Sequence, residues 1–163
     1  MKKGLIIFAV LGLTLLMGCG DGEKKEASPY GKKTEQKAET KTVDATPASV
    51  RVDLTNKGIG PIKSVTLGAE IDTEMAALGE GVFNANCTAC HKADKKFIGP
   101  APKGILERRT PEWVMNMILN PEEMTQNDPL AKDLLVEFNG SPMANQHLSE
   151  EQTRQILEYF RTL

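Results

Sequence analysis

The stretch FNANCTACHKADKKFIGP, residues 83–100, carries the most informative motif of this 163-residue sequence. It places Cys87 and Cys90 three residues apart, with His91 directly after the second cysteine. Three kinds of site use a Cys-x-x-Cys pair: a structural zinc site, a redox-active disulfide and a covalently attached haem. Each of them implies a different protein, so the remaining residues must decide between them.

The number of other cysteines and histidines in the chain helps to distinguish the zinc, disulfide and haem sites. The chain has three cysteines and two histidines, whereas a structural zinc site needs four ligands, usually from two such pairs. A thioredoxin-like disulfide is expected in a βαβ setting, and the pattern around this pair is helical. Cys-x-x-Cys-His is the attachment signature of c-type haem, in which both sulfurs bond the porphyrin and the histidine binds the iron. We therefore predict one covalent haem c on Cys87 and Cys90, with His91 as an axial ligand.

An iron atom held by His91 has a second axial position. Met143 lies in a loop ahead of the last predicted helix, where a purely space-filling methionine is less expected. Its thioether would complete a His/Met pair, which raises the reduction potential of a haem. Met117 lies within a helical segment and is expected to fill the core. Met124 and His147 remain alternative ligands.

Capping residues predict an all-α domain of about four helices over residues 72–163. The helix starts are marked by Asp72, by Thr110 before Pro111, by Asp128 before Pro129, and by Ser149 with Gln152 three residues later. Asn120–Pro121 is expected to end the second helix, and Asn139–Gly140 the third. A core of this size usually needs a large cofactor or a metal for stability.

The N-terminus predicts export. Lys2 and Lys3 precede an apolar run over residues 4–17, which is shorter than the roughly 20 residues of a membrane-spanning helix and is typical of a signal peptide. The run ends in LMGC, residues 16–19, which resembles the lipobox of bacterial lipoprotein precursors. We predict that residues 1–18 are removed and that Cys19 is lipidated. An uncleaved anchor, or a secreted protein with a free Cys19, is the alternative.

The region after Cys19 is predicted to be a flexible, lipid-anchored tether over residues 19–49. Residues 20–48 contain six acidic and six basic residues and almost no aliphatic ones, so they cannot bury enough apolar surface to offset the entropy of ordering. Residues 50–71 alternate weakly and are expected to form a short hairpin or an extended arm of unassigned role. The predicted location is the cell envelope, with the domain in the periplasm or at the cell surface.

Residues 72–163 resemble the class I cytochromes c, which are small all-helical electron carriers with one haem. The features that match, in chain order, are Gly79 and Phe83 in the first helix, Gly99–Pro100 after the haem motif, Pro142–Met143 in the loop, and Ile156, Tyr159 and Phe160 in the last helix. The resemblance implies a bundle around a covalent haem, in which Gly79 lets the first and last helices cross closely.

Further roles follow from this resemblance. The carbonyl of Pro100 is expected to accept a hydrogen bond from the iron-binding histidine, which would fix its tautomer. The only tryptophan, Trp113, is expected either to contact a haem propionate or to pack in the core. The family commonly has a leucine against the haem where this chain has Pro102, so Ile105 or Leu106 is expected to fill that volume.

With both axial positions filled by side chains, one-electron transfer is the chemistry that remains, and we predict neither an enzyme nor a small-molecule substrate. If Met143 does not bind the iron, a haem enzyme or a gas sensor becomes the alternative. If haem is absent, a lipid-anchored interaction module remains. Basic residues are interleaved with acidic ones and aromatic residues are few, so nucleic acid is not a predicted partner.

The predicted partners are redox proteins, including a membrane-bound donor. Residues 92–109 contain six basic and two acidic residues, whereas residues 110–163 contain nine acidic and three basic ones. This asymmetry would steer a charged partner to the basic region, where Lys95 and Lys96 lie, although such runs are often ordinary solvated surface. The stretch 108–143 has a weak similarity to monohaem lipoproteins associated with respiratory copper reductases. A reductase such as nitrous oxide reductase is therefore a candidate acceptor.

Overall fold

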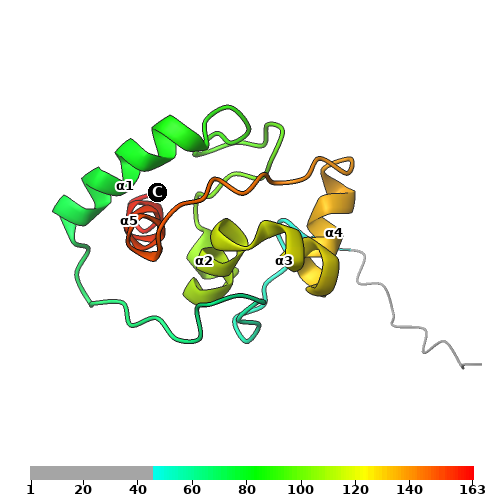
Figure 1. Cartoon of the computed structure of the whole chain (residues 1–163), viewed down its shortest axis with the longest axis horizontal. Helices are drawn as coiled ribbons and strands as arrows, with labels where there is room; N and C mark the ends of the chain where they lie inside the picture. The colour runs from blue at the N-terminus through cyan, green and yellow to red at the C-terminus, as the bar shows by residue number, and fades with distance from the viewer. Residues whose placement is uncertain (1–45) are drawn as a thin grey trace, which may run out of the picture. The chain divides into compact units, whose positions relative to one another are not determined.

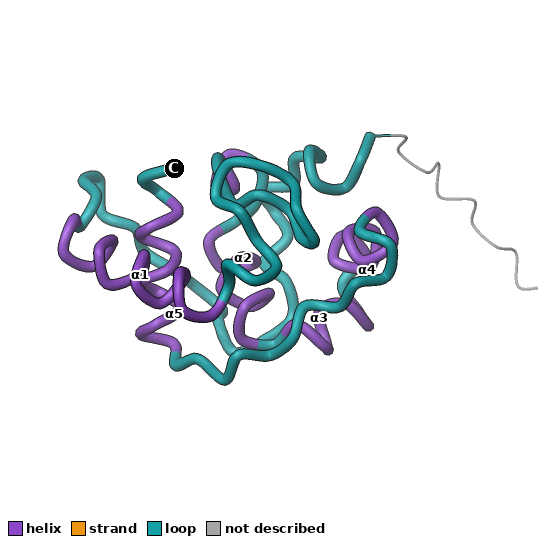
Figure 2. The backbone as a smooth tube through the Cα atoms, turned by 90° about the horizontal axis from the view of Figure 1, so that it is seen from above, coloured by secondary structure: helices purple, strands orange, loops and turns teal. Residues whose placement is uncertain are grey.

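The computed structural model describes residues 46–163, and this part of the chain contains five α-helices, one 3-10 turn and no strand (Figures 1 and 2). The elements are α1 (Thr73–Asn86), the 3-10 turn η1 (Ile105–Glu107), α2 (Pro111–Leu119), α3 (Pro121–Asn127), α4 (Pro129–Glu137) and α5 (Glu150–Phe160). The predicted all-α fold is confirmed. None of these helices is both long and apolar enough to cross a membrane.

The predicted helix starts are confirmed by their caps. The side chains of Asp72, Thr110 and Asp128 accept hydrogen bonds from backbone N–H groups in the first turns of α1, α2 and α4. Ser149 and Gln152 form both halves of a capping box at the start of α5. Each cap satisfies N–H groups that have no partner inside the helix, and this is why local sequence located the starts so well.

Asn120–Pro121 ends α2, as predicted, but it also begins another helix. Asn120 leaves the helical conformation, with φ −139° and ψ 51°, and Pro121 occupies the first position of α3. A proline is tolerated there because the N–H it lacks would have no helical partner. The number of α-helices in the described part is therefore five and not four. The predicted end of α4 is confirmed, since Asn139 and Gly140 both have positive φ values directly after it.

The close crossing of α1 and α5 depends on Gly79, as the resemblance to the cytochromes c implied. A Cβ atom at this position would lie 1.9 Å from the carbonyl oxygen of Gln155, so no larger residue fits. Next to this contact, the ring of Phe83 lies 5.5 Å from the ring of Tyr159 and 5.7 Å from that of Phe160, measured between centroids. The two helices form one wall of the domain (Figure 1).

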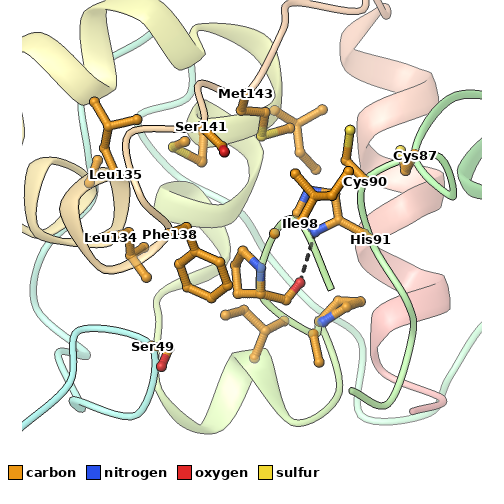
Figure 3. A pocket seen from close by; sticks show the side chains of 18 of the residues that line it. Ser49, Cys87, Cys90, His91, Ile98, Leu134, Leu135, Phe138, Ser141 and Met143 are labelled. Atoms are coloured by element: carbon orange, nitrogen blue, oxygen red, sulfur yellow. Dashed lines mark hydrogen bonds between the residues drawn. The ribbon is translucent and has the colours of Figure 1, made fainter. Parts of the chain in front are cut away.

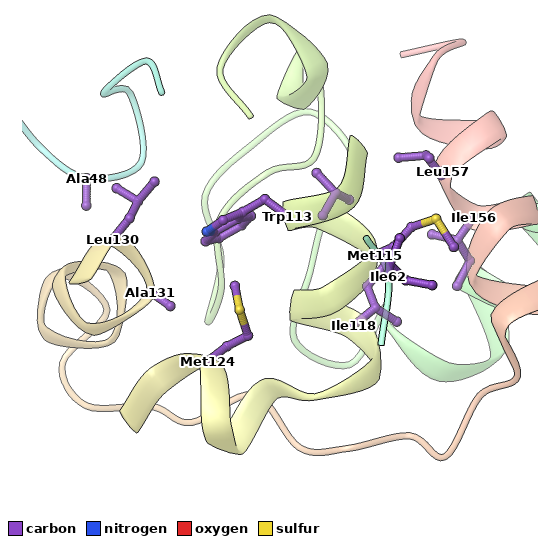
Figure 4. Close-up of a cluster of buried hydrophobic side chains, with 11 residues drawn as sticks. Ala48, Ile62, Trp113, Met115, Ile118, Met124, Leu130, Ala131, Ile156 and Leu157 are labelled. Atoms are coloured by element: carbon purple, nitrogen blue, oxygen red, sulfur yellow. The ribbon is translucent and has the colours of Figure 1, made fainter. Parts of the chain in front are cut away.

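The buried core surrounds Trp113 (Figure 4). Met124, Leu130 and Ala131 lie on one side of the indole ring, while side chains of α2 and α5 lie on the other (Figure 4). Ala48, only 3% exposed, and Ile62, 8% exposed, also belong to this core. The compact domain therefore includes residues that precede position 72.

The predicted tether is thus too long at its C-terminal end. The backbone N–H and the hydroxyl of Ser49 both donate to the Glu137 carboxylate, at 2.8 and 2.5 Å, so this residue is fixed to α4. Residues 50–71 contain no helix or strand, and the segment that packs on the domain begins before them. Residues 46–71 are called the arm below. The predicted signal peptide, Cys19 and the tether up to residue 45 lie outside the described residues.

Long-range hydrogen bonds hold the arm along its length. Asn116 Nδ2 donates to the carbonyl of Ile62 at 2.9 Å, and the N–H of Ile62 donates back to Asn116 Oδ1 at 2.9 Å. The N–H of Val65 donates to Glu112 at 3.1 Å. At the far end, Arg161 Nη2 donates to the carbonyl of Gly68 at 2.7 Å. Side chains of α2 and the C-terminal residues thus supply the partners that an isolated extended segment would lack.

Candidate functional site

A large, mainly apolar cavity lies between the end of α1, the loop that follows it, α2, α4 and the loop before α5 (Figure 3). Cys87, Cys90, His91 and Met143 all line this cavity. Figure 3 shows Cys87, Cys90 and His91 on one side of it and Leu134 and Phe138 of the α4 region across from His91, while Met143 lies at the top of the view near Ser141. The structure therefore brings together the four residues that were predicted to attach a haem and bind its iron.

His91 is held in one orientation. Its Nδ1 lies 2.8 Å from the carbonyl oxygen of Pro100 (dashed line in Figure 3), which confirms the predicted hydrogen bond. Because a carbonyl can only accept, the proton must be on Nδ1, and the lone pair is left on Nε2. Gly99 permits this arrangement, since a Cβ atom there would lie 2.5 Å from His91 Cε1. The tautomer that a metal requires is therefore set by the backbone.

The two cysteines line the cavity and are not joined by a disulfide. Cys87 is half-buried and Cys90 is exposed. Burial, and then the neighbouring thiol of Cys90, raises the pKa of Cys87 to about 11. Such a thiol is protonated at neutral pH and is a poor thiolate ligand or disulfide-exchange nucleophile. In residues 46–163, no three His, Cys, Asp or Glu side chains gather into a group that could hold a metal ion.

The two alternative iron ligands, Met124 and His147, both lie outside the cavity lining. Met124 is fully buried away from the cavity, and its sulfur accepts a hydrogen bond from the N–H of Ile59 at 3.0 Å. His147 is exposed and does not line the cavity. Met117, expected in the core, does line it. The cavity therefore offers two thioethers, one on a loop and one on α2.

Trp113 lines the cavity, but its N–H group has a partner within the chain. Its Nε1 donates to Asp128 Oδ1 at 3.2 Å, and the indole is only 3% exposed. Of the two roles considered, the structure favours core packing over a propionate contact. The sequence could not reveal this pair, because Asp128 is also the cap of α4 and its second role depends on how α2 and α4 pack.

Apolar side chains occupy the volume that the family's leucine was expected to fill, where this chain has Pro102. Pro102 itself is buried and lines the cavity, and Ile105 lines it as well. Leu106 packs against the hydrophobic core and is absent from the cavity lining. Of the two candidates, Ile105 supplies the apolar surface.

Two arginines that the sequence suggested to be surface charges also line the cavity. Arg109 is only 1% exposed, which corrects its assignment to the charged surface, and Arg108 is half-buried. The Nε–H groups of both are buried and have no hydrogen-bond partner in the structure. Buried donors of this kind are costly unless a ligand satisfies them. Two such donors beside an apolar cavity with two thiols and an imidazole fit haem, which carries two carboxylates on an apolar ring.

Residues 76–163 match the family model described as Cytochrome c. The chain belongs to the cytochrome c family. This cytochrome c is 50% identical to the solved cytochrome c from Rhodothermus marinus, with a TM-score of 0.61, over 63% of this chain and 88% of that one. It is 48% identical to the engineered Rhodothermus marinus cytochrome c Rma TDE, with a TM-score of 0.61, over 63% and 89% of the two chains.

A third solved structure is that of Rma TDE bound to a carbene intermediate, with 48% identity, a TM-score of 0.58, and coverage of 63% of this chain and 88% of that chain. Curated protein sequences contain no significant match.

Membership of this family settles the cofactor. The protein binds haem c covalently, and Cys87 and Cys90 occupy the positions of the attachment motif. It is accordingly a haem-based electron carrier. The predicted cofactor and the cytochrome c fold are both confirmed.

Proposed function

We propose that this cytochrome c is a membrane-tethered one-electron carrier whose iron is held by His91 and Met143. The observation that carries the proposal is that the imidazole and the thioether line the same apolar cavity as the two cysteines. Haem c supplies one-electron exchange between Fe(III) and Fe(II). His91 would bind the iron through Nε2, because its Nδ1–H is committed to the carbonyl of Pro100. Two protein ligands leave no site for a substrate, and the apolar lining excludes water.

Met143→Ala is expected to abolish the weak near-infrared methionine-to-iron band of the oxidised protein and to shift its spectrum toward high spin. It should also lower the reduction potential, because a thioether favours Fe(II). Met117→Ala is the matched control, since it removes the other thioether that lines the cavity. Optical spectra and potentiometric titration of both holoproteins check this expectation.

Loss of the band in Met117→Ala, with Met143→Ala unchanged, would assign the ligand to α2. A high-spin spectrum in the unmodified protein would contradict His/Met ligation altogether. It would favour the alternative of a haem enzyme or gas sensor with an open site.

The membrane attachment rests on the sequence of residues 1–19. Removal of residues 1–18 would make Cys19 the first residue, and two or more acyl chains on it would anchor the protein stably. Treated as a flexible coil, a tether of roughly 26 residues up to the domain has a root-mean-square reach of about 30 Å. The domain then works in the periplasm or at the cell surface, within reach of membrane-bound donors.

The docking surface for redox partners is proposed to lie beside the cavity. Phe97 and Ile98 are 50% and 46% exposed, and Ile98 also lines the cavity. Lys92, Lys95 and Lys96 flank them, and the Lys92 ammonium lies 5.0 Å from the centre of the Phe97 ring. An apolar patch with a basic rim suits an acidic redox protein, such as a copper reductase, because opposite charges accelerate encounter.

Reversal of two of these charges, Lys95→Glu with Lys96→Glu, is expected to slow oxidation by an anionic iron hexacyanide complex about tenfold at low salt. The difference should shrink at high salt, because exposed charges are screened. Stopped-flow spectroscopy measures both rates. Lys63→Glu with Lys132→Glu makes the same change of charge at exposed positions outside the cavity lining and serves as the control. Equal rates in the two double variants would refute the proposed surface.

A further inference from the structure

The arm encloses the charged side chain of Arg109. Nη2 of this residue donates to the carbonyl of Ala48, and Nη1 donates to the carbonyls of Arg51 and Arg108. Within residues 46–163, no carboxylate lies within ion-pair distance of Arg109. Backbone carbonyls, two of them from the arm, therefore replace water around this positive charge.

The same guanidinium belongs to the wall of the haem cavity. Arg109 lines the cavity, and its Nε is buried without a partner. Its central carbon lies 5.3 Å from the centre of the Trp113 ring, which lines the cavity as well. The arm reaches this ring by a second route, because Asn56 Nδ2 donates to Asp128 at 2.7 Å and Asp128 accepts from Trp113. The arm therefore holds both members of the Arg109–Trp113 stack.

We propose that the arm raises the reduction potential of the haem by holding the guanidinium of Arg109, shielded from water, in the wall of the cavity. This inference rests on the proposed electron-carrier function and deepens it. Uptake of an electron lowers the charge at the iron by one, so a nearby positive charge favours the reduced state. The effect is larger in a dry site, because a low dielectric weakens screening. The arm precedes residues 76–163, the part that matches the family model.

Arg109 keeps its charge in this position. Burial, and then the charge of Arg108, lowers its pKa to about 10, while Asp53 and Asp128 act in the opposite direction. The guanidinium is therefore still protonated at neutral pH. The cost of burying it is reduced by the arm carbonyls, which links the position of the arm to the charge in the cavity wall.

The arm, whose Ser49 also lines the cavity, can be loosened by substituting acids that do not themselves line it. Ser49 is fixed by the Glu137 carboxylate, and Arg51 Nη1 lies 2.7 Å from Asp133 Oδ2. Both acids belong to α4, and neither lines the cavity. Substitution of Glu137 therefore tests whether the attachment of the arm affects the reduction potential. Substitution of Arg109 tests whether the positive charge does.

The first test removes the charge of Arg109 and measures the reduction potential of the holoprotein by potentiometric titration. Arg109→Gln is expected to lower the equilibrium constant for reduction at least tenfold, which is about 59 mV for one electron. Arg109→Lys keeps the positive charge, so its equilibrium constant for reduction should fall less than that of Arg109→Gln. Lys132→Gln removes an exposed positive charge from α4 and should change the constant less than about twofold, because water screens it. Equal constants in Arg109→Gln and Lys132→Gln would overturn the proposal.

The second test measures how the attachment of the arm affects the reduction of the haem. It can still be carried out if the Arg109→Gln variant does not fold with haem attached. Glu137→Ala is expected to accelerate amide hydrogen exchange in residues 46–56 and to lower the equilibrium constant for reduction at least about threefold. Loss of a negative charge alone would raise this constant, so the sign identifies the arm. Glu122→Ala removes an exposed acid from α3 and is the matched control. Faster exchange in Glu137→Ala without a fall in the constant would overturn the proposal.

The optical spectrum of each sample separates this inference from the proposed function. A missing methionine-to-iron band in the unmodified protein would refute His/Met ligation and leave the potential shifts as the test of the arm. A band present in every variant, with potentials equal to those of the controls, would refute only the role of the arm.

Discussion

Cys87→Ala combined with Cys90→Ala is expected to eliminate covalent haem and cooperative folding together. The two thiols are the attachment points, so the double variant has no sulfur in the motif to bond the porphyrin. Without the cofactor, the cavity between α1, α2 and α4 becomes an unfilled space with mainly apolar walls. Large cavities of this kind cost several kcal/mol, and total stability is only about 5–15 kcal/mol.

Haem staining after denaturing electrophoresis and far-ultraviolet circular dichroism measure these two losses. Ala89→Ser, between the two cysteines, keeps both sulfurs and should retain staining and helicity. Each single cysteine variant keeps one attachment point and should give an intermediate result. Covalent haem in the double variant, or an unchanged unfolding transition, would contradict the expectation.

Gly79→Ala is expected to destabilise the domain by about 3 kcal/mol or more, at the upper end of the range for overpacking. The new Cβ would lie 1.9 Å from the carbonyl oxygen of Gln155, 2.3 Å from its carbonyl carbon and 2.8 Å from the nitrogen of Ile156. All three are backbone atoms of α5, so no rotamer change relieves the clash. The helices would have to separate, which would also disturb the aromatic contacts of Phe83 with α5.

Denaturant unfolding of the holoprotein measures this effect, and α1 offers its own control. Gly81 lies two residues further along the same helix and is exposed, and a Cβ atom there would meet no other part of the protein within 4 Å. Gly81→Ala should stabilise the protein by roughly 0.5–1 kcal/mol, because alanine favours helix more than glycine does. Similar losses in both variants would show that helix propensity, and not the crossing, determines the effect.

The helix starts were predictable because a capping residue acts within its own first turn. Asp72, Thr110, Asp128 and Ser149 could be identified from neighbours no more than three residues away. α3 was missed for a related reason. Asn120–Pro121 carries the signals of a helix end and of a helix start at once, and local rules gave priority to the end.

The haem motif was predictable for the same reason, whereas the walls of its cavity were not. Cys87, Cys90 and His91 are close in sequence, so their chemistry needs no knowledge of the fold. Arg109 looked like one more surface charge, because its burial depends on carbonyls 58 and 61 residues earlier in the chain. Its neighbour Arg108 was misjudged in the same way.

By itself, the sequence determined the all-helical class, the helix starts and the covalent haem, because each depends on short-range signals or on a motif that one chemistry explains. The close crossing at Gly79 was implied only by the resemblance to the cytochromes c, because it joins segments far apart in the chain. Tertiary structure alone decided that the arm belongs to the domain and that Trp113 donates to Asp128. It also decided that Arg109 lies in the cavity wall. These features arise where segments far apart in the chain pack together, and the free energy of burying a polar group there depends on partners that no local pattern specifies.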